Sequence, residues 1–329
     1  MKWSRNLKVL RRGVRLATQI AQAELGLGTP TAPPARPRRT EPGIEEVAAF
    51  GRNPGRLRML VRRPKGGIKP HQPLIVVLHG CGQDAASFAT AAGWAALSDR
   101  IGVPLILPVQ SDLNHQHRCF RWFQPAHTAR GRGEAESIAE MVATGLTRFD
   151  ADPRRVFVVG LSAGGAMAAA LLAAYPELFA AGAVVAGLPV GAAHSPMQAL
   201  ARMAQAGPDQ SADAWVAAVR EVAPPAHAGP WPRLSIWQGG ADTVVDPANA
   251  SLLALQWRAL LGLPETPTTD ISRGPIRCRR WGPAAAPGVE LWTIPGLAHG
   301  YPIAQGRAAP FVPLAGVAAT TEIAAFWGL

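Results

Sequence analysis

The apolar residues of this chain fall into short runs, which are typical of strands buried inside a parallel sheet. Such runs predict strands at 57–61, 74–78, 104–108, 156–160, 180–186, 234–237 and 289–294. Helical patterns separate most of them, at 84–100, 134–149, 247–261 and 317–327. Strands that alternate with helices predict a parallel sheet with right-handed crossovers, so the fold class is α/β.

The run at 156–160 leads directly into Gly160-Leu161-Ser162-Ala163-Gly164, and an alanine-rich helical pattern begins at once. A strand, a sharp turn and a helix in this order are what the G-x-S-x-G nucleophile elbow requires. The glycines are needed because a side chain on either would strike the neighbouring strand or helix. Ser162 is therefore the candidate nucleophile, with its hydroxyl exposed at the carboxyl end of the sheet.

The alternation of strands and helices lapses at residues 188–230. Two helical patterns, 197–205 and 212–222, stand there between Pro-rich turns. We interpret this segment as a small helical insertion that lies over the site, a candidate cap. A later stretch, 262–288, is rich in Pro and Arg, and no element is predicted within it.

The net charge of +11 is concentrated near the N-terminus. Residues 1–65 hold 15 of the 33 Lys and Arg residues and 4 of the 22 Asp and Glu residues, so the remainder of the chain is neutral. A neutral body argues against a nucleic-acid-binding enzyme, which needs a basic face on its folded domain. Because residues 28–43 are rich in proline, we predict an N-terminal extension at 1–44 and a single domain at 45–329.

The sequence also predicts a partner for the extension. Its apolar residues recur at intervals of three and four, which predicts a basic amphipathic helix over 3–24 that can lie on an anionic or granule surface. A disordered leader is the alternative. Basic residues interrupt every apolar stretch near the N-terminus, so no secretory signal is predicted, and the cytoplasm is favoured over the extracellular space.

Other classes of site are also disfavoured by the composition. No apolar stretch is long enough to predict a transmembrane segment. The three cysteines show no C-x-x-C spacing, so neither a metal site nor a disulfide scaffold is expected.

A serine nucleophile needs a base, a carboxylate that orients the base, and donors for the oxyanion. The elbow predicts the chain order Ser, acid, His, with each residue on a loop after a strand. Asp242 follows the run at 234–237, and His299 follows the run at 289–294. We assign His299 as the general base and then acid, and Asp242 as its orienting carboxylate. Asp246 is the alternative acid, although its place at a helix start is explained by capping.

Backbone amides that stabilise the oxyanion leave no side-chain pattern in the sequence. The residue after the nucleophile, Ala163, and Cys81, in the loop after 74–78, are the candidate donors. Gly80 and Gly82 allow this loop to approach a reacting carbonyl. His79 precedes the nucleophile, and we expect it to shape the loop.

Several segments together resemble the polyhydroxybutyrate (PHB) depolymerase and feruloyl esterase branch of the α/β-hydrolases. They are LHGCGQDAASFA (78–89), GWAALSDR (93–100), CFRWFQPAHTARGRGEAESIAEMV (119–142), GLSAGGAMAAALLAAYPELFAAGAVVAGLPVGAA (160–193), WQGGADTVVDPANA (237–250) and GLAHGYP (296–302). The resemblance implies an α/β-hydrolase fold, with a mostly parallel central sheet flanked by helices. It also implies the hydrolysis of short-chain polyhydroxyalkanoates or related esters without a cofactor.

The resemblance further implies a disulfide between Cys81 and Cys119, which would fit an oxidising compartment. Two reduced cysteines in the cytosol are the alternative. Trp122 is the candidate for a hydrophobic wall against the acyl chain, and core packing is the other interpretation of this residue.

The sequence thus predicts a serine esterase that acts through an acyl-enzyme, with a PHB-type depolymerase as the first hypothesis and an ester, polymeric or not, as its partner. A feruloyl or acetyl-carbohydrate esterase is the alternative within this class. A non-catalytic protein that binds a polymer or granule surface is the alternative from another class. The intact set of Ser162, Asp242 and His299 favours the enzyme, because a binding protein does not need all three.

Overall fold

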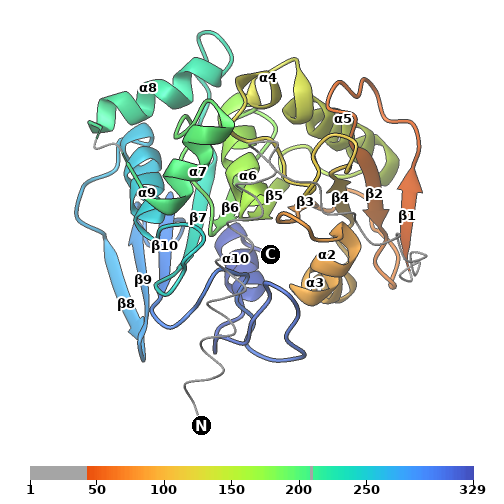
Figure 1. The fold of residues 1–329 in the computed structure, drawn as a ribbon. Coiled ribbons are helices and arrows are strands. Elements are labelled where there is room, and N and C mark those ends of the chain that lie inside the picture. The colour runs from red at the N-terminus through yellow and green to blue at the C-terminus, as the bar shows by residue number, and fades with distance from the viewer. Residues whose placement is uncertain (1–42, 208–209) are drawn as a thin grey trace.

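The computed structural model of this protein describes residues 43–207 and 210–329. These residues form a ten-stranded sheet in the order β1-β2-β4-β3-β5-β6-β7-β10-β9-β8 (Figure 1). The strands are β1 (Ile44–Val47), β2 (Arg58–Arg62), β3 (Leu74–Leu78), β4 (Leu105–Val109), β5 (Val156–Leu161), β6 (Ala181–Val185), β7 (Arg233–Gly239), β8 (Thr269–Arg273), β9 (Ile276–Trp281) and β10 (Val289–Ile294).

The six central strands, from β4 to β10 in this order, run parallel to one another. The pairs at both edges of the sheet are antiparallel. The carboxyl ends of the parallel strands meet at one edge of the sheet, which is where open α/β sheets bind ligands. The predicted α/β class with a mostly parallel sheet is confirmed.

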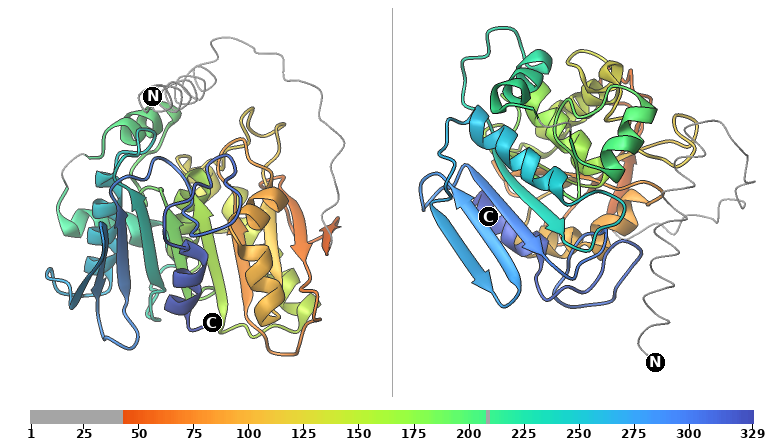
Figure 2. Two further views of the ribbon diagram at one scale, coloured as in Figure 1. Left: turned by 90° about the horizontal axis from the view of Figure 1, so that it is seen from below. Right: turned by 60° about the vertical axis from the view of Figure 1, so that its left-hand side comes forward.

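Helices cover both faces of the sheet. They are α2 (Ala85–Ala91), α3 (Trp94–Ile101), α4 (Pro125–Thr128), α5 (Gly133–Phe149), α6 (Ala163–Ala174), α7 (Pro196–Ala204), α8 (Ala212–Val222), α9 (Ala248–Leu260) and α10 (Ala319–Trp327). Figure 2 (left) shows α10 and the α2–α3 pair against one face. Among these helices, none combines the length and the apolar character that crossing a bilayer requires.

The period of two along each strand explains the two layers. In β3, Leu74, Val76 and Leu78 pack in the cluster that includes α5, α6 and α9. Ile75 and Val77 point the other way, into the cluster that includes α2, α3 and α10. Both faces of β3 are buried, so its sequence is a continuous apolar run.

The structure differs from the sequence prediction in several places, and β1 and the short helix α4 lie where no element was predicted. The helix predicted at 84–100 is two helices, because Gly93 between them has φ +89°, a conformation that favours glycine. The stretch 262–288 contains the β8–β9 hairpin at the sheet edge. Its strands carry mainly polar side chains, so no apolar run marks them in the sequence.

The predicted domains can be compared with the structure only in part. The predicted helix at 3–24 lies outside the described residues, as does nearly all of the extension at 1–44. The first strand begins at Ile44, next to the expected domain start at 45. The segment 188–230 contains α7 and α8, close to the two helical patterns predicted there.

Candidate active site

Ser162 stands at a strained turn between β5 and α6. Its backbone has φ 58° and ψ −121°, a region that non-glycine residues rarely adopt. A Cβ atom on Gly160 would lie 2.1 Å from the carbonyl oxygen of Gly164, and one on Gly164 would lie 2.5 Å from that of His79. Both positions therefore require glycine, and the turn has the geometry of a nucleophile elbow.

His299 and Asp242 meet above neighbouring parallel strands. Asp242 follows β7 and His299 follows β10, and the two strands end in register at Gly239 and Ile294. The Nδ1 atom of His299 lies 2.8 Å from Oδ2 of Asp242. The structure thus brings together the histidine and the acid that the chain order selected.

Asp242 is buried among donors. Its Oδ1 accepts hydrogen bonds from the amides of Val244 (2.8 Å) and Val245 (2.9 Å), and its Oδ2 accepts one from Nε2 of Gln238 (3.0 Å). Burial acts to raise the pKa of Asp242, but the hydrogen bond from His299 and the two amides lower it below its usual value. An ionised carboxylate only accepts hydrogen bonds, so Nδ1 of His299 carries a proton, and in the neutral ring the lone pair is on Nε2.

Asp246, the alternative acid, accepts hydrogen bonds from backbone amides. Its Oδ1 accepts from the amide of Ala248 at the start of α9 (3.0 Å), and its Oδ2 accepts from the amide of Ala206 (2.9 Å). The carboxylate thus contacts a helix start, as its sequence position suggested.

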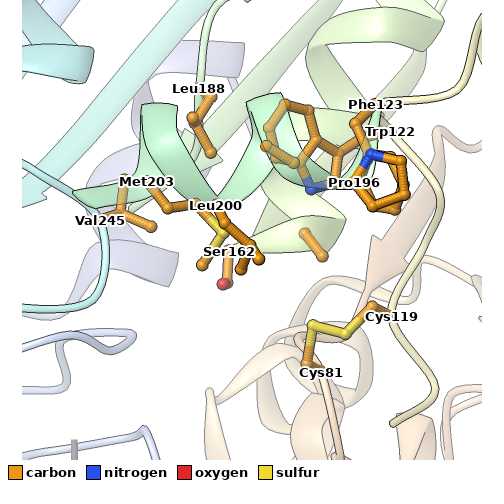
Figure 3. Close-up of a pocket in the computed structure, with 12 residues that line it drawn as sticks. Cys81, Cys119, Trp122, Phe123, Ser162, Leu188, Pro196, Leu200, Met203 and Val245 are labelled. Atoms are coloured by element: carbon orange, nitrogen blue, oxygen red, sulfur yellow. A yellow bond between two sulfur atoms is a disulfide. The ribbon is translucent and has the colours of Figure 1, made fainter. Parts of the chain in front are cut away.

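Two small pockets meet at Ser162, whose exposed fraction is 8%. The first, called here the acyl pocket, is lined mainly by apolar side chains and by the disulfide (Figure 3). The second, called here the histidine pocket, is lined by Gly80, Cys81, Gln83, Leu161, Ser162, Val244, His299 and Phe311. Ser162 and His299 therefore face the same pocket, and Cys81 borders both.

The loop after β3 is fixed by a disulfide and several hydrogen bonds. Cys81 is joined to Cys119. The amide of Gly82 donates to the carbonyl of His117 (2.7 Å), and the amide of Gly80 donates to Oε1 of Gln83 (2.8 Å). This loop presents Cys81 to both pockets. Ala163, the other candidate donor, is the first residue of α6, so its amide has no acceptor within that helix.

His79 orients the peptide unit between Gly80 and Cys81. Its Nδ1 lies 2.8 Å from the carbonyl oxygen of Gly80, and its Nε2 accepts from the amide of Gln110 (3.2 Å). The carbonyl and amide of a trans peptide point to opposite sides, so holding the Gly80 oxygen also fixes the direction of the Cys81 N–H. Burial lowers the pKa of His79 to about 4, so the ring is neutral with its proton on Nδ1.

The sequence prediction missed a buried carboxylate that supports the loop carrying Cys119 and Trp122. Glu134 accepts hydrogen bonds from Nε2 of Gln110 (2.6 Å) and from the amide and Nε of Arg121 (2.8 and 2.9 Å). Burial raises the pKa of Glu134, against the effect of these donors. An acidic residue in the first turn of a helix is common, so nothing in the sequence distinguished Glu134 from a surface residue.

Trp122 is 9% exposed and lines the acyl pocket. The sequence prediction did not identify the part of the lining that comes from α7 in the candidate cap and consists of Pro196, Ala199, Leu200 and Met203. Across the described residues, no group of three or more His, Cys, Asp or Glu side chains is arranged to hold a metal ion.

Comparison with known proteins places this geometry in a family. Residues 59–279 match the model of the family described as esterase PHB depolymerase. A poly(3-hydroxyalkanoate) depolymerase C of Paucimonas lemoignei is 38% identical over 267 residues, which cover 81% of this chain and 64% of that protein. The match therefore spans less than two thirds of that depolymerase.

Other similar proteins are acetylxylan and feruloyl esterases. A probable acetylxylan esterase A of Aspergillus fumigatus is 30% identical, and the match covers 75% of this chain and 67% of that protein. A feruloyl esterase B of Neurospora crassa is 34% identical, with 67% and 75% covered. The solved structure of an acetyl xylan esterase from Aspergillus awamori has a TM-score of 0.75 at 23% identity and covers 87% of this chain and 98% of its own, which supports the α/β-hydrolase fold. The chain belongs to the esterase PHB depolymerase family.

Proposed function

We propose that this protein is a serine esterase that hydrolyses short-chain polyhydroxyalkanoates or related carboxylic esters through an acyl-enzyme. The observation that carries the proposal is the 2.8 Å contact between Nδ1 of His299 and Asp242, beside a serine at a strained elbow. Family membership and the match to a poly(3-hydroxyalkanoate) depolymerase support the substrate class.

In the proposed reaction, Oγ of Ser162 attacks the ester carbonyl as Nε2 of His299 takes its proton. The amides of Cys81 and Ala163 donate to the oxyanion of the tetrahedral intermediate. His299 then gives the proton to the departing alcohol, and an acyl-enzyme remains on Ser162. Water attacks this ester by the same steps, releases the acid and restores the serine. Asp242 stabilises the imidazolium each time it forms.

The two pockets indicate the orientation in which the ester binds. The departing alcohol must receive its proton from His299, so it belongs on the histidine-pocket side. The acyl group then enters the acyl pocket, whose lining is mainly apolar. This direction suits an ester with a small apolar acyl group and an alcohol side open to a longer chain.

The test is hydrolysis of p-nitrophenyl butyrate and of a PHB suspension by the intact protein and by Ser162→Ala. We expect turnover of both substrates, and a loss in the variant of at least about 10³-fold. Turnover of the soluble ester alone would support the esterase mechanism and exclude PHB as a substrate. Turnover of neither would favour a non-catalytic surface-binding protein.

An acetyl- or feruloyl-carbohydrate esterase is the second candidate, favoured by the matches of 30% and 34% identity. Acetylated xylan and methyl ferulate in the same assay distinguish the two. A preference for either over PHB of tenfold or more in rate would select the second candidate.

We also propose that the basic residues before residue 43 bring the enzyme to an anionic or granule surface. The support is their charge, since Lys and Arg far outnumber Asp and Glu in this part of the chain.

A further inference from the structure

A second cavity lies next to the acyl pocket. Its lining includes Pro125, Ala166, Ala170, Val190, Ala218 and Val222, and its cavity volume is about 60 Å³, compared with about 20 Å³ for the acyl pocket. Of the described residues, only Trp122 lines both. The two spaces are therefore neighbours with this indole between them.

The backbone on either side supports this arrangement. On α6, Ala163 borders the acyl pocket, and Ala166, one helical turn later, borders the second cavity. After β6, Leu188 borders the acyl pocket and Pro189 the second cavity. Figure 3 shows the Trp122 ring on the Leu188 side of the acyl pocket, away from the disulfide.

The indole is held firmly in this position. Trp122 belongs to the buried cluster that includes Phe123, Ala166 and Leu188. Its ring meets that of Phe123 edge to face, with 5.6 Å between the centroids. The neighbouring Arg121 is bound through its amide and its Nε to the buried Glu134. The segment carrying Trp122 is thus fixed on both sides.

The second cavity has an interior suited to hydrocarbon. Ala166, Ala170 and Val190 are buried apolar residues, whereas the polar side chains of His194 and Glu221 belong to exposed residues. The one buried polar side chain of the lining is that of Thr128, whose hydroxyl donates to the carbonyl of Gln124 (3.4 Å). A linear acyl chain that outgrows the acyl pocket in this direction meets the indole before it reaches this space.

We propose that Trp122 is the specificity-determining wall that restricts the enzyme to short acyl groups, and that the second cavity is a latent site for a longer chain. This inference rests on the proposed esterase function. It identifies the substrates as esters of short acids, such as 3-hydroxybutyrate units, and excludes those of medium-chain acids.

The test compares kcat/KM for p-nitrophenyl octanoate and p-nitrophenyl butyrate in the same samples. In Trp122→Ala we expect the octanoate-to-butyrate ratio to rise at least about tenfold, because the removed wall opens space for the extra methylenes. Trp122→Phe keeps a ring in place and should stay closer to the wild-type ratio. The double variant Trp122→Ala/Ala218→Leu fills the opened space and should lower the ratio again.

Loss of a buried indole is destabilising. Trp122→Leu is therefore a second variant, which removes the ring but leaves a smaller void. The substrate ratio does not depend on the folded fraction, because both esters report on the same active molecules. If Trp122→Ala and Trp122→Leu still hydrolyse the butyrate ester with an unchanged octanoate-to-butyrate ratio, Trp122 does not limit the length of the acyl chain. If the ratio rises in Trp122→Ala but Ala218→Leu does not lower it again, the longer acyl chain does not occupy the second cavity. If the wild type turns over neither ester, the proposed esterase function fails, and this is distinguishable from failure of the wall.

Discussion

At the residue scale, His79 makes the stability of the loop after β3 dependent on pH. Its neutral ring donates from Nδ1 and accepts at Nε2, and a proton on Nε2 would displace the Gln110 amide. Its pKa is about 4 in the folded protein, against about 6.5 for an unfolded histidine. Between these values the unfolded chain binds more protons, so this contribution to stability is complete above about pH 6.5 and is lost as the pH falls towards 4.

We therefore expect the unfolding free energy to depend less on pH in His79→Asn than in the wild type. Asparagine can still donate to the Gly80 carbonyl, but it has no ring nitrogen to protonate. Between pH 7 and pH 5, the variant should lose about 2 kcal/mol less than the wild type. Urea unfolding at both pH values measures this difference, in which the contributions of other titrating groups largely cancel. Equal losses in the two proteins would contradict the role of His79.

The choice between Asp242 and Asp246 gives a second prediction at this scale. Asp242→Asn should lower kcat for p-nitrophenyl butyrate by about 10³–10⁴-fold, because an amide favours the wrong tautomer of His299. Asp246→Asn is the matched control, since its carboxylate binds the amides of Ala206 and Ala248 and does not contact His299. If kcat fell further in Asp246→Asn than in Asp242→Asn, Asp246 would be the carboxylate that orients His299.

The sequence predicted the side chains whose chemistry depends on chain order, and apart from Trp122 it missed those that act by packing. Ser162, Asp242 and His299 each follow a strand, so pattern and mechanism select the same residues. Leu200 and Met203 are ordinary apolar residues of a short helix, and only the folded chain brings them to the acyl pocket.

At the element scale, the disulfide joins two loops of the site that hydrogen bonds also connect. Besides the Cys81–Cys119 bond, Gly82 pairs with His117, and Nη2 of Arg118 donates to the carbonyl of Gly82 (2.9 Å). These contacts should preserve the fold after reduction, while the Cys81 amide becomes less well positioned.

We expect Cys81→Ser/Cys119→Ser to lower kcat about tenfold or more with a smaller change in KM, because a displaced oxyanion donor acts on the transition state. The free energy of unfolding should fall by up to about 4 kcal/mol, from the loss of a closed loop with a sequence separation of 38 residues. Dithiothreitol should lower the activity of the wild type towards that of the double variant, and it should leave the activity of the double variant unchanged. Cys278→Ser is the control, since this cysteine is free and buried. Full wild-type activity after verified reduction would remove the disulfide from the mechanism.

The hairpin of β8 and β9 and the break between α2 and α3 escaped prediction for two different physical reasons. Strands of the central sheet are buried on both faces and are apparent as apolar runs, whereas β8 and β9 pair residues such as Asp270 with Arg279 at an edge. Polar edge strands carry no core pattern. The α2–α3 break depends on one glycine, and Thr320 of α10 donates to the carbonyl of Ala92 there (2.6 Å), a contact that the local sequence cannot reveal.

At the scale of the whole molecule, the described body contains every residue assigned to the reaction. The sheet begins at Ile44, which pairs with Arg62, and the candidate site spans His79 to His299. The residues before Gly43 include nine Lys or Arg and two Glu. The proposed chemistry and the proposed attraction to a surface thus belong to separate parts of the chain.

A variant that begins at Gly43 should therefore keep its kcat/KM for p-nitrophenyl butyrate within about twofold of the intact protein and lose adsorption to anionic vesicles. Adsorption of the intact protein should weaken as salt is raised from about 0.05 to 0.5 M, because screening shortens the reach of the basic residues. A full-length variant with Arg36, Arg38 and Arg39 replaced by glutamine is the matched control, and its adsorption should fall between the two. Co-sedimentation with vesicles and with PHB particles measures binding beside turnover. If removal of residues 1–42 abolished turnover of the soluble ester in a protein that still unfolds cooperatively, the extension would belong to the catalytic machinery.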